Sequence, residues 1–231
     1  MTDPQGPGAA APRADRLLVV GGGPGIGQAI TAAWPERTTT WTRSTGVDAG
    51  DPEQVRAAFA RLTALHGAPY ALLHCVGDFA ERPLLATDEA TYRDLFRSNV
   101  DTAFHVLQAV VPAMVAARRG RVVLFAAAGV DRDRAMLRAP VYFAAKAALV
   151  QLARALAAET AAAQITVNVI APGLIHHDHS HQASQDRMLP RVPAGRLGRT
   201  EEVVALVRYL LSDAAAYVTG QVLTIDGGLQ G

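Results

Sequence analysis

The sequence predicts an α/β fold of one domain, a doubly wound parallel sheet covered by helices. Short apolar runs rich in β-branched residues alternate with longer Ala-rich segments that are typical of helices. The first apolar run ends in a glycine cluster that opens a helical segment. The chain has 231 residues, 50% of them hydrophobic, which is enough for one substantial core.

Composition narrows the possible classes of function. The net charge is +1, and acidic and basic residues are interspersed, so nucleic acid is not expected as a partner. We see no apolar run near the roughly 20 residues that span a bilayer, so no membrane association is expected. Residues 1–16 are rich in Pro, Gly and Ala and predict a disordered tail before a domain over 17–231. Cys75 is the only cysteine, which excludes an internal disulfide and favours a cytoplasmic location.

The first strand is predicted over 17–20, and a helix over 26–33 follows the glycine turn. Glycines let the backbone approach a pyrophosphate, and a helix N-terminus supplies amide donors. This order of strand, turn and helix predicts a Rossmann-type dinucleotide site, with an ordinary tight turn as the alternative.

The second strand, predicted over 38–42, bears on the choice of cofactor. An acid at the end of this strand binds a ribose 2′-hydroxyl, whereas an arginine accommodates a 2′-phosphate. The sequence has Arg43 and then Ser44, with no acid. It therefore favours NADP(H) over NAD(H), with a plain surface charge as the alternative interpretation of Arg43.

The remaining elements follow in alternation. Asp51 predicts the N-cap of a helix over 52–66, with Pro52 in the first turn. We count residues 70–76 as the fourth strand, 121–125 as the fifth and 165–170 as the sixth, before a last strand over 222–225. Helices are expected over 87–118, in one or two pieces, over 139–160, and from a cap at Thr200 to about Ser212.

Tyr142 and Lys146 stand four residues apart in a predicted helix, so their side chains share one face. A neighbouring ammonium lowers the pKa of a phenol from about 10 and makes the tyrosine a usable proton donor. Lys146 is the only lysine of the chain, and arginine cannot replace it in a proton relay. This favours a functional pair over a solvated lysine beside a packed tyrosine.

Several motifs in one order resemble the short-chain dehydrogenase/reductase family. They are the glycine turn, Asn99, Tyr142-x-x-x-Lys146, the Pro172-Gly173 turn and the closing Asp226-Gly227-Gly228. The resemblance spans nearly the whole chain from Leu17. It implies a homo-oligomer, tetramer or dimer, with the helix around Tyr142 in the subunit interface, and a small substrate lid at about 174–193.

The resemblance also implies site residues. Asp48 would meet the adenine, Lys146 would hold the nicotinamide ribose, and Asn99 would support a water that links the lysine to solvent. The cofactor-binding positions that it carries over are Gly21, Gly25, Ile26, Gly27, Arg43, Ser44, Asp48, Ala49, Val76, Gly77, Tyr142, Lys146, Pro172, Gly173 and Ile175.

The chain departs from the family pattern at three places. Pro24 removes one backbone donor from the glycine loop. His74-Cys75-Val76-Gly77 replaces the usual Asn-Asn-Ala-Gly, and His74 could form the lost hydrogen bond or be a satisfied structural histidine. The family's catalytic Ser is replaced by Ala, most simply Ala127, and no hydroxyl lies between Phe125 and Tyr142. Losing such a donor commonly costs about 2.7–4 kcal/mol.

Three functions are compatible with these residues. The first is an NADP(H)-dependent oxidoreductase that reduces a C=O or C=N bond of a small organic molecule, with Tyr142 as the proton donor. The second is an imine or quinonoid pterin reductase without need of the Ser, since the segment 125–146 looks like that of dihydropteridine reductases. The third is a non-redox NADP-binding structural or sensor protein.

A histidine-rich loop completes the candidates. His177 is expected to contact the substrate beside Ala127. It stands among His176, His179 and His181, so a zinc or nickel site is one interpretation. We expect no metal, because a solvated polar loop, or recognition of a polar or acidic substrate, explains the same residues.

Overall fold

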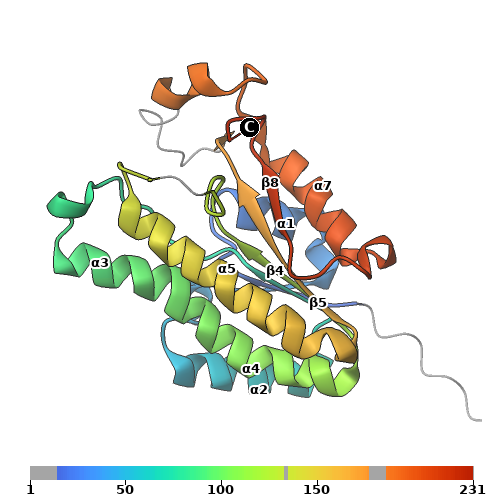
Figure 1. Ribbon diagram of the computed structural model, residues 1–231. Coiled ribbons are helices and arrows are strands. Elements are labelled where there is room, and N and C mark those ends of the chain that lie inside the picture. The colour runs from blue at the N-terminus through green and yellow to red at the C-terminus, as the bar shows by residue number, and fades with distance from the viewer. Residues whose placement is uncertain (1–14, 133–134, 177–185, 231) are drawn as a thin grey trace, which may run out of the picture.

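The protein is seen here as a computed structural model that describes residues 15–132, 135–176 and 186–230 (Figure 1). Six strands form one parallel sheet in the order β2-β1-β3-β4-β5-β8. Their bounds are β1 Leu17–Val20, β2 Thr38–Trp41, β3 Ala71–His74, β4 Gly120–Phe125, β5 Ile165–Pro172 and β8 Val222–Ile225. Val20 pairs with both Trp41 and His74, so the carboxyl ends of neighbouring strands meet at one edge. The predicted doubly wound fold is confirmed.

Helices cover both faces of this sheet (Figure 1). One face carries α1 and α7, which contact each other, and the opposite face carries α2, α4 and α5. A separate pair of very short strands, β6 and β7, lies outside the main sheet. The bounds are α1 Ile26–Ala33, α2 Pro52–His66, α3 Glu89–Phe96, α4 Thr102–Ala117, α5 Pro140–Thr160, α7 Thr200–Leu211, β6 Ile175–His176 and β7 Gly198–Arg199.

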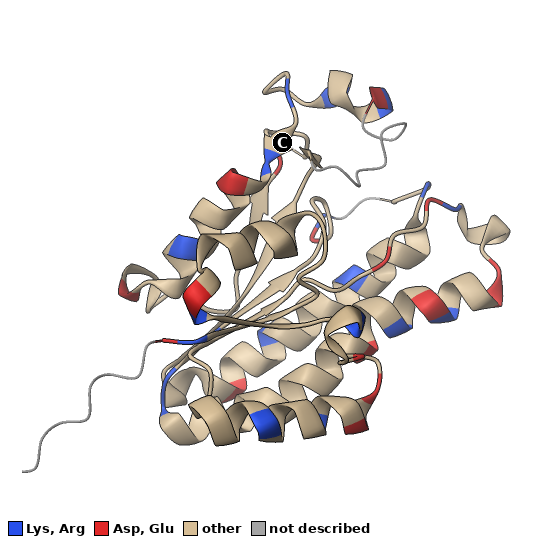
Figure 2. Cartoon of the chain, turned by 180° about the vertical axis from the view of Figure 1, so that it is seen from behind, with Lys and Arg blue, Asp and Glu red and all other residues tan. Residues whose placement is uncertain are grey.

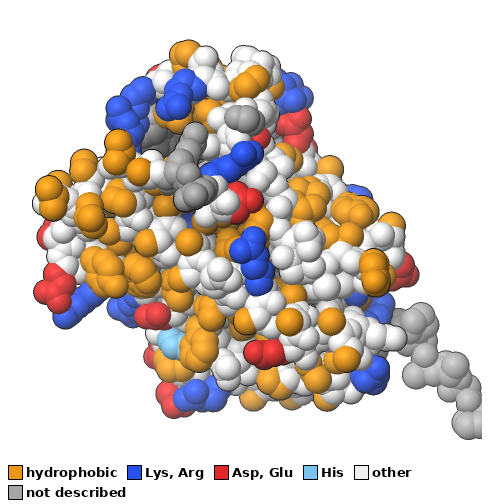
Figure 3. All heavy atoms as spheres, viewed as in Figure 1, with side chains coloured by type: hydrophobic (Ala, Val, Ile, Leu, Met, Phe, Trp, Pro, Cys, Tyr) orange, Lys and Arg blue, Asp and Glu red, His pale blue; other side chains and the backbone are white. Residues whose placement is uncertain are grey.

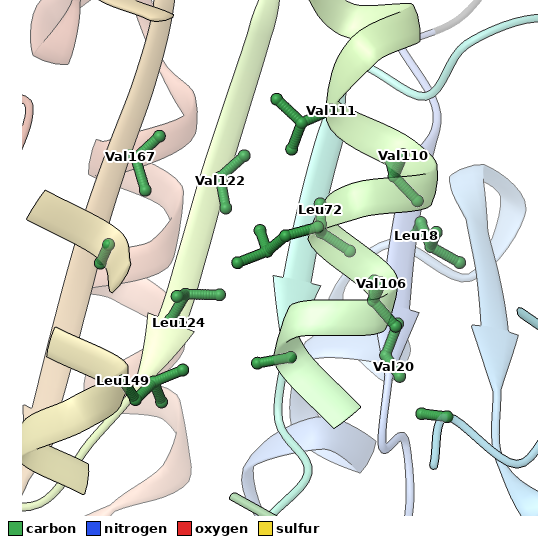
Figure 4. Close-up of a cluster of buried hydrophobic side chains, with 14 of the residues drawn as sticks. Leu18, Val20, Leu72, Val106, Val110, Val111, Val122, Leu124, Leu149 and Val167 are labelled. Atoms are coloured by element: carbon green, nitrogen blue, oxygen red, sulfur yellow. The ribbon is translucent and has the colours of Figure 1, made fainter. Parts of the chain in front are cut away.

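The core follows the two-residue period of the strands. Leu18, Val20 and Leu72 point to the face of α4, where Val106 and Val110 pack on them (Figure 4). The alternate residues Leu17, Val19 and Leu73 belong to the cluster on the opposite face. Strands buried on both faces hold the sheet rigid, and this fixes the edge at which the site lies.

The count of strands was wrong by one. Residues 70–76 were expected to hold the fourth strand, but β3 is third along the chain because the segment after β2 forms a turn. Thr42 accepts backbone hydrogen bonds from Thr45 and Val47, and Gly46 closes the turn with a φ of 80°. Asp51 then caps α2 through bonds from the amides of Glu53 and Gln54, as predicted.

Two helices differ from expectation in detail. The helix predicted over 87–118 changes pitch, because residues Arg97–Asp101 form a π-helical turn between α3 and α4. The cap of α7 is Arg199 rather than Thr200, since the Glu202 carboxylate accepts from the Arg199 amide at 2.8 Å. At the start of the described chain, the Arg16 carbonyl accepts hydrogen bonds from the amides of Tyr70 and Ala71.

The surface is mixed in character. Basic and acidic residues alternate over the helices (Figure 2), and hydrophobic side chains gather over α3, among them the exposed Tyr92 (Figure 3). Two stretches, Glu89–Ala117 and Pro140–Ala163, are long and apolar enough to cross a membrane by length and composition alone. We had seen no such run in the sequence. Both stretches bury one side against the sheet, which accounts for much of their apolar character.

Candidate active site

A cavity of about 1380 Å³ opens at the carboxyl ends of the strands. It reaches from the glycine turn after β1, past the ends of β2 and β3, to the start of α5 and the end of β5. Pockets for drug-sized ligands are roughly 300–1,000 Å³. This cavity is therefore large enough for a dinucleotide together with a second, smaller molecule.

The glycine turn is shaped by close backbone contacts. A Cβ on Gly21 would lie 2.8 Å from the Val76 amide nitrogen, and one on Gly27 would lie 2.1 Å from the Gly21 carbonyl oxygen. Gly25 has a φ of 102° and precedes α1, whose first turn has neither a side-chain cap nor an acidic residue. No side chain covers the positive dipole end of α1, although the Gln28 amide already donates to the Gly23 carbonyl at 3.0 Å, and this helix start fits a pyrophosphate.

The end of the cavity near β2 carries Arg43 and Asp48. Arg43 is exposed and forms no ion pair within the described part of the chain. Asp48 is fixed at both ends: its amide donates to the Gln54 side chain at 3.0 Å, and its carboxylate accepts from the Gly50 amide at 2.8 Å. The Ser44 hydroxyl shares a hydrogen bond of 2.8 Å with the Thr42 hydroxyl.

Tyr142 and Lys146 share one face of α5, as predicted. Lys146 is buried, and its Nζ donates a hydrogen bond of 2.8 Å to the Phe125 carbonyl. The same nitrogen lies 5.8 Å from the centre of the Tyr142 ring. Phe79 packs edge-on against that ring at 5.0 Å, and Phe143 does so at 5.4 Å. Nothing in the described segments hydrogen-bonds the Tyr142 hydroxyl.

Burial dominates the pKa values of this pair. It lowers the pKa of Lys146 from 10.5 to about 8 and raises the pKa of Tyr142 from 10.0 to about 12. The lowered pKa expected for Tyr142 was wrong for the protein without ligand, because burial removes water from the phenol and raises its pKa. At neutral pH the tyrosine is a protonated phenol beside a mostly protonated lysine.

Asn99 lies in the π-helical turn between α3 and α4 and points toward Lys146. Its Nδ2 donates to the carbonyls of Leu95 and Asp78 at 2.9 and 3.0 Å, which fixes the amide. Its buried Oδ1 has no protein partner among the described residues. A Cβ on Gly77 would lie 2.3 Å from this oxygen and 2.8 Å from Lys146 Nζ. Only glycine leaves room for both groups, and a water molecule is a suitable partner for the oxygen.

His74 differs from both expectations for it. The side chain is 1% exposed, and neither ring nitrogen has a hydrogen-bond partner in the described ranges. It neither replaces the lost asparagine bonds nor is a satisfied structural histidine. The reason is its place in β3, where it lies between the apolar Val20 and Leu124 of the adjacent strands. Burial, assisted by the charge of Lys146, lowers its pKa to about 3.

The loops after β3 and β4 and the segment after β8 bring residues that the sequence did not single out. Glu81 pairs with Arg138 at 3.1 Å and with Arg187 at 2.6 Å, which ties three separate segments together. Apolar and amide side chains line the same region: Phe79, Met136, Leu137, Met188, Leu229 and Gln230. They belong to no motif. They lie in the loops that follow β3, β4, β6 and β8, and this position was the one available signal.

The cavity gathers most, but not all, of the predicted site. Gly25, Ser44, Asn99 and Lys146 do not line it, although the last two lie behind Gly77. His177 lies outside the described residues, and so do His179 and His181. No group of three His, Cys, Asp or Glu side chains is arranged for a metal ion in the described ranges. The predicted residues that do line the cavity are Gly21, Ile26, Gly27, Arg43, Asp48, Ala49, Val76, Gly77, Ala127, Tyr142, Pro172, Gly173 and Ile175.

Known proteins match this chain over most of its length. The profile of a family described as enoyl-(acyl carrier protein) reductase matches residues 27–230. The 3-oxoacyl-(acyl-carrier-protein) reductase FabG of Escherichia coli K12 is 31% identical over 236 residues, or 92% of this chain and 96% of the relative. Galactitol 2-dehydrogenase (L-tagatose-forming) of Cereibacter sphaeroides is 37% identical over 188 residues, covering 78% and 73%. A short-chain type dehydrogenase/reductase from Mycobacterium ulcerans superposes with a TM-score of 0.83 at 27% identity, covering 94% and 90%.

Proposed function

The chain belongs to the short-chain dehydrogenase/reductase family, and we propose that it is an NADP(H)-dependent oxidoreductase that reduces a C=O or C=N bond. One observation carries this proposal. Tyr142 lines the cavity that also contains the open glycine turn, and the chain's only lysine is buried directly beside it. The site thus combines a place for a dinucleotide with a group that can move a proton.

The residues present fit the cofactor. The glycine turn and the amides of α1 would hold the pyrophosphate, Asp48 and Ala49 the adenine, and Pro172, Gly173 and Ile175 the nicotinamide end. Arg43, which has no ion pair in the described chain, would bind a 2′-phosphate and so favour NADP(H) over NAD(H). A bound nicotinamide supplies the hydride; the protein supplies position and electrostatics.

Side chains of the protein transfer the proton. Tyr142 Oη donates a proton to the oxygen or nitrogen of the reduced bond, because its phenol is protonated at neutral pH and lines the cavity. Lys146 stabilises the phenolate that this leaves. Asn99 Oδ1, beside Lys146 Nζ, holds the water through which the pair regains its proton.

The absence of a hydroxyl side chain at the position of the family's catalytic Ser favours a narrower second function. Ala127 lines the cavity, and no Ser, Thr or Tyr lies between Phe125 and Tyr142. A C=N acceptor such as a cyclic imine or quinonoid pterin needs less support of a developing oxyanion than a ketone does. With such an acceptor the hydrogen bond that the family's Ser donates would not be needed, so no other residue would have to supply it.

Two further properties belong to the same proposal. We expect a homo-oligomer, dimer or tetramer, because α4 exposes Phe104 and Val115 beside the Ala-rich α5. We also expect a cytoplasmic protein that acts on a small molecule. The substrate lid expected at about 174–193 lies in part outside the described residues.

The experiment has two stages. Purified protein is first titrated with NADPH and NADH, and we expect tighter binding of NADPH. Oxidation of NADPH is then followed with a panel of ketones, cyclic imines and quinonoid pterins. Tight NADPH binding with no oxidation across the panel would instead support a non-redox binding protein or sensor.

A further inference from the structure

The ring of Phe79 lies against the side chain that is proposed to donate the proton. Its centroid is 5.0 Å from that of the Tyr142 ring, and the two rings are nearly perpendicular, at 89°. Phe79 is nonetheless 38% exposed, and both rings line the cavity. A molecule bound in the cavity next to Tyr142 therefore meets Phe79 as well.

The backbone before Phe79 is held by the π-helical turn between α3 and α4. The Asp78 amide donates to the Ser98 hydroxyl at 3.2 Å, and the Asp78 carbonyl accepts from Asn99 Nδ2 at 3.0 Å. A contact made by a side chain on an already ordered backbone costs less conformational entropy when a ligand binds. The fold thus places Phe79 at the cavity before a substrate arrives.

Ion pairs bring further apolar side chains to the same region. Glu81, in the loop after β3 that also carries the phenylalanine, pairs with Arg138 at 3.1 Å and with Arg187 at 2.6 Å. Leu137 and Met188 are the sequence neighbours of these two arginines, and both line the cavity. The charged groups thus hold together three segments that each contribute an apolar side chain to the cavity wall.

A planar aromatic group is the occupant that this wall fits best. Phe143 also lines the cavity and packs against the Tyr142 ring at 5.4 Å, so two aromatic rings contact the phenol ring. Aromatic groups attract one another edge-on or offset, beyond the gain from burying their area. The polarizable sulfur of a methionine such as Met188 makes favourable contacts with them too. A saturated group of the same size gains only from the burial of its area.

We propose that Phe79 is a specificity-determining residue, and that the preferred substrates carry an aromatic ring on the carbon of the C=O or C=N bond that is reduced. The ring of the substrate packs on Phe79, and the oxygen or nitrogen of the reduced bond faces the Tyr142 hydroxyl. Phe79 thereby orients the substrate by its apolar side. This inference deepens the proposed function of the same site and rests on it.

The test compares acetophenone with cyclohexyl methyl ketone, which share a carbon skeleton and differ in whether the ring is aromatic. Their binding to the protein with NADP+ is measured by calorimetry, and their kcat and KM with NADPH are measured separately. We expect wild type to bind acetophenone at least ~5-fold more tightly, which is within the range of one aromatic pair. Phe79→Leu should reduce this ratio at least ~3-fold. Phe79→Tyr, which keeps a ring, and Tyr217→Leu, at a fully exposed tyrosine, should both retain it.

The outcomes separate the role of Phe79 from the proposed function. Equal binding of the two ketones by wild type, or an unchanged ratio in Phe79→Leu, would overturn the role of Phe79 in specificity. Turnover of both ketones that falls by the same factor in Phe79→Leu would also overturn it, since the ring would then only position Tyr142. Phe79→Ile serves as a second variant should the leucine protein fail to fold. Absence of NADPH oxidation with any acceptor would count against the reductase function, while the binding ratio would still decide on Phe79.

Discussion

Lys146 Nζ lies 5.8 Å from the centre of the Tyr142 ring and gives its hydrogen bond to the Phe125 carbonyl. The lysine is therefore anchored to the end of β4 while its charge lies beside the phenol. Burial acts on both groups, raising the pKa of the tyrosine and lowering that of the lysine. Under the proposed function this pair donates a proton at neutral pH, and its burial has consequences for stability.

The substitution Lys146→Met should change how stability depends on pH. The pKa of Lys146 is about 8 in the folded protein, against 10.5. The folded state therefore binds fewer protons than the unfolded state between these values, and wild type gains stability as pH rises through them. The gain is about 3 kcal/mol. Methionine does not titrate, so the variant lacks this gain. Urea unfolding at pH 7 and pH 10 should show that the free energy of unfolding of wild type rises by about that much relative to that of the variant. If the difference in free energy of unfolding between wild type and variant were the same at both pH values, this would contradict the burial of the Lys146 ammonium.

His74→Leu should make the protein less sensitive to acid. The pKa of His74 is about 3 in the folded protein, against 6.5, so its contribution to stability is present above pH 6.5 and is lost as pH falls toward 3. At pH 4.5 the loss is about 2–3 kcal/mol. Urea unfolding at pH 7 and pH 4.5 should show a smaller loss in the leucine variant. His66→Leu, at the half-exposed end of α2, should keep the acid sensitivity of wild type.

The contrast between these two residues indicates what the sequence could predict. The spacing of Tyr142 and Lys146 follows from helix geometry, and the order of Gly21, Gly25 and Gly27 follows from the turn; both are local patterns. The state of His74 depends on Val20 and Leu124, which are distant in sequence and adjacent only in the sheet. Gln230 and Phe79 reach the cavity from loops whose course no local pattern fixes. Burial of Tyr142 likewise arises from long-range packing, which is why the direction of its pKa shift was missed.

Arg43→Ala should weaken NADPH binding at least ~10-fold and change NADH binding less than about 2-fold. The reason is loss of a charge-assisted hydrogen bond to the 2′-phosphate, which NADH lacks. Fluorescence titration with each cofactor checks this. Arg61→Ala, an exposed arginine on α2, is the matched control and should behave as wild type. If Arg43→Ala weakened the binding of NADPH and of NADH equally, this would contradict the proposed preference for NADP(H).

Ala127→Ser distinguishes the two acceptor classes. The new hydroxyl would line the cavity and stabilise a developing oxyanion, so kcat/KM for ketones should rise at least ~10-fold. Turnover of imines should change little, because their transition state develops less charge on oxygen. Steady-state kinetics with one ketone and one cyclic imine checks this, with the exposed Ala60→Ser as control. A variant that gains nothing with ketones would show that another group already supplies the donor.

Tyr142→Phe tests the proton-donating role most directly. The variant keeps the ring that packs on Phe79 and Phe143 and removes only the hydroxyl. Its NADPH affinity and its turnover of the best acceptor are measured side by side. We predict an affinity within a few-fold of wild type and a turnover reduced by at least ~100-fold. A variant that still turns over within a few-fold of wild type would contradict the role of Tyr142 as the proton donor.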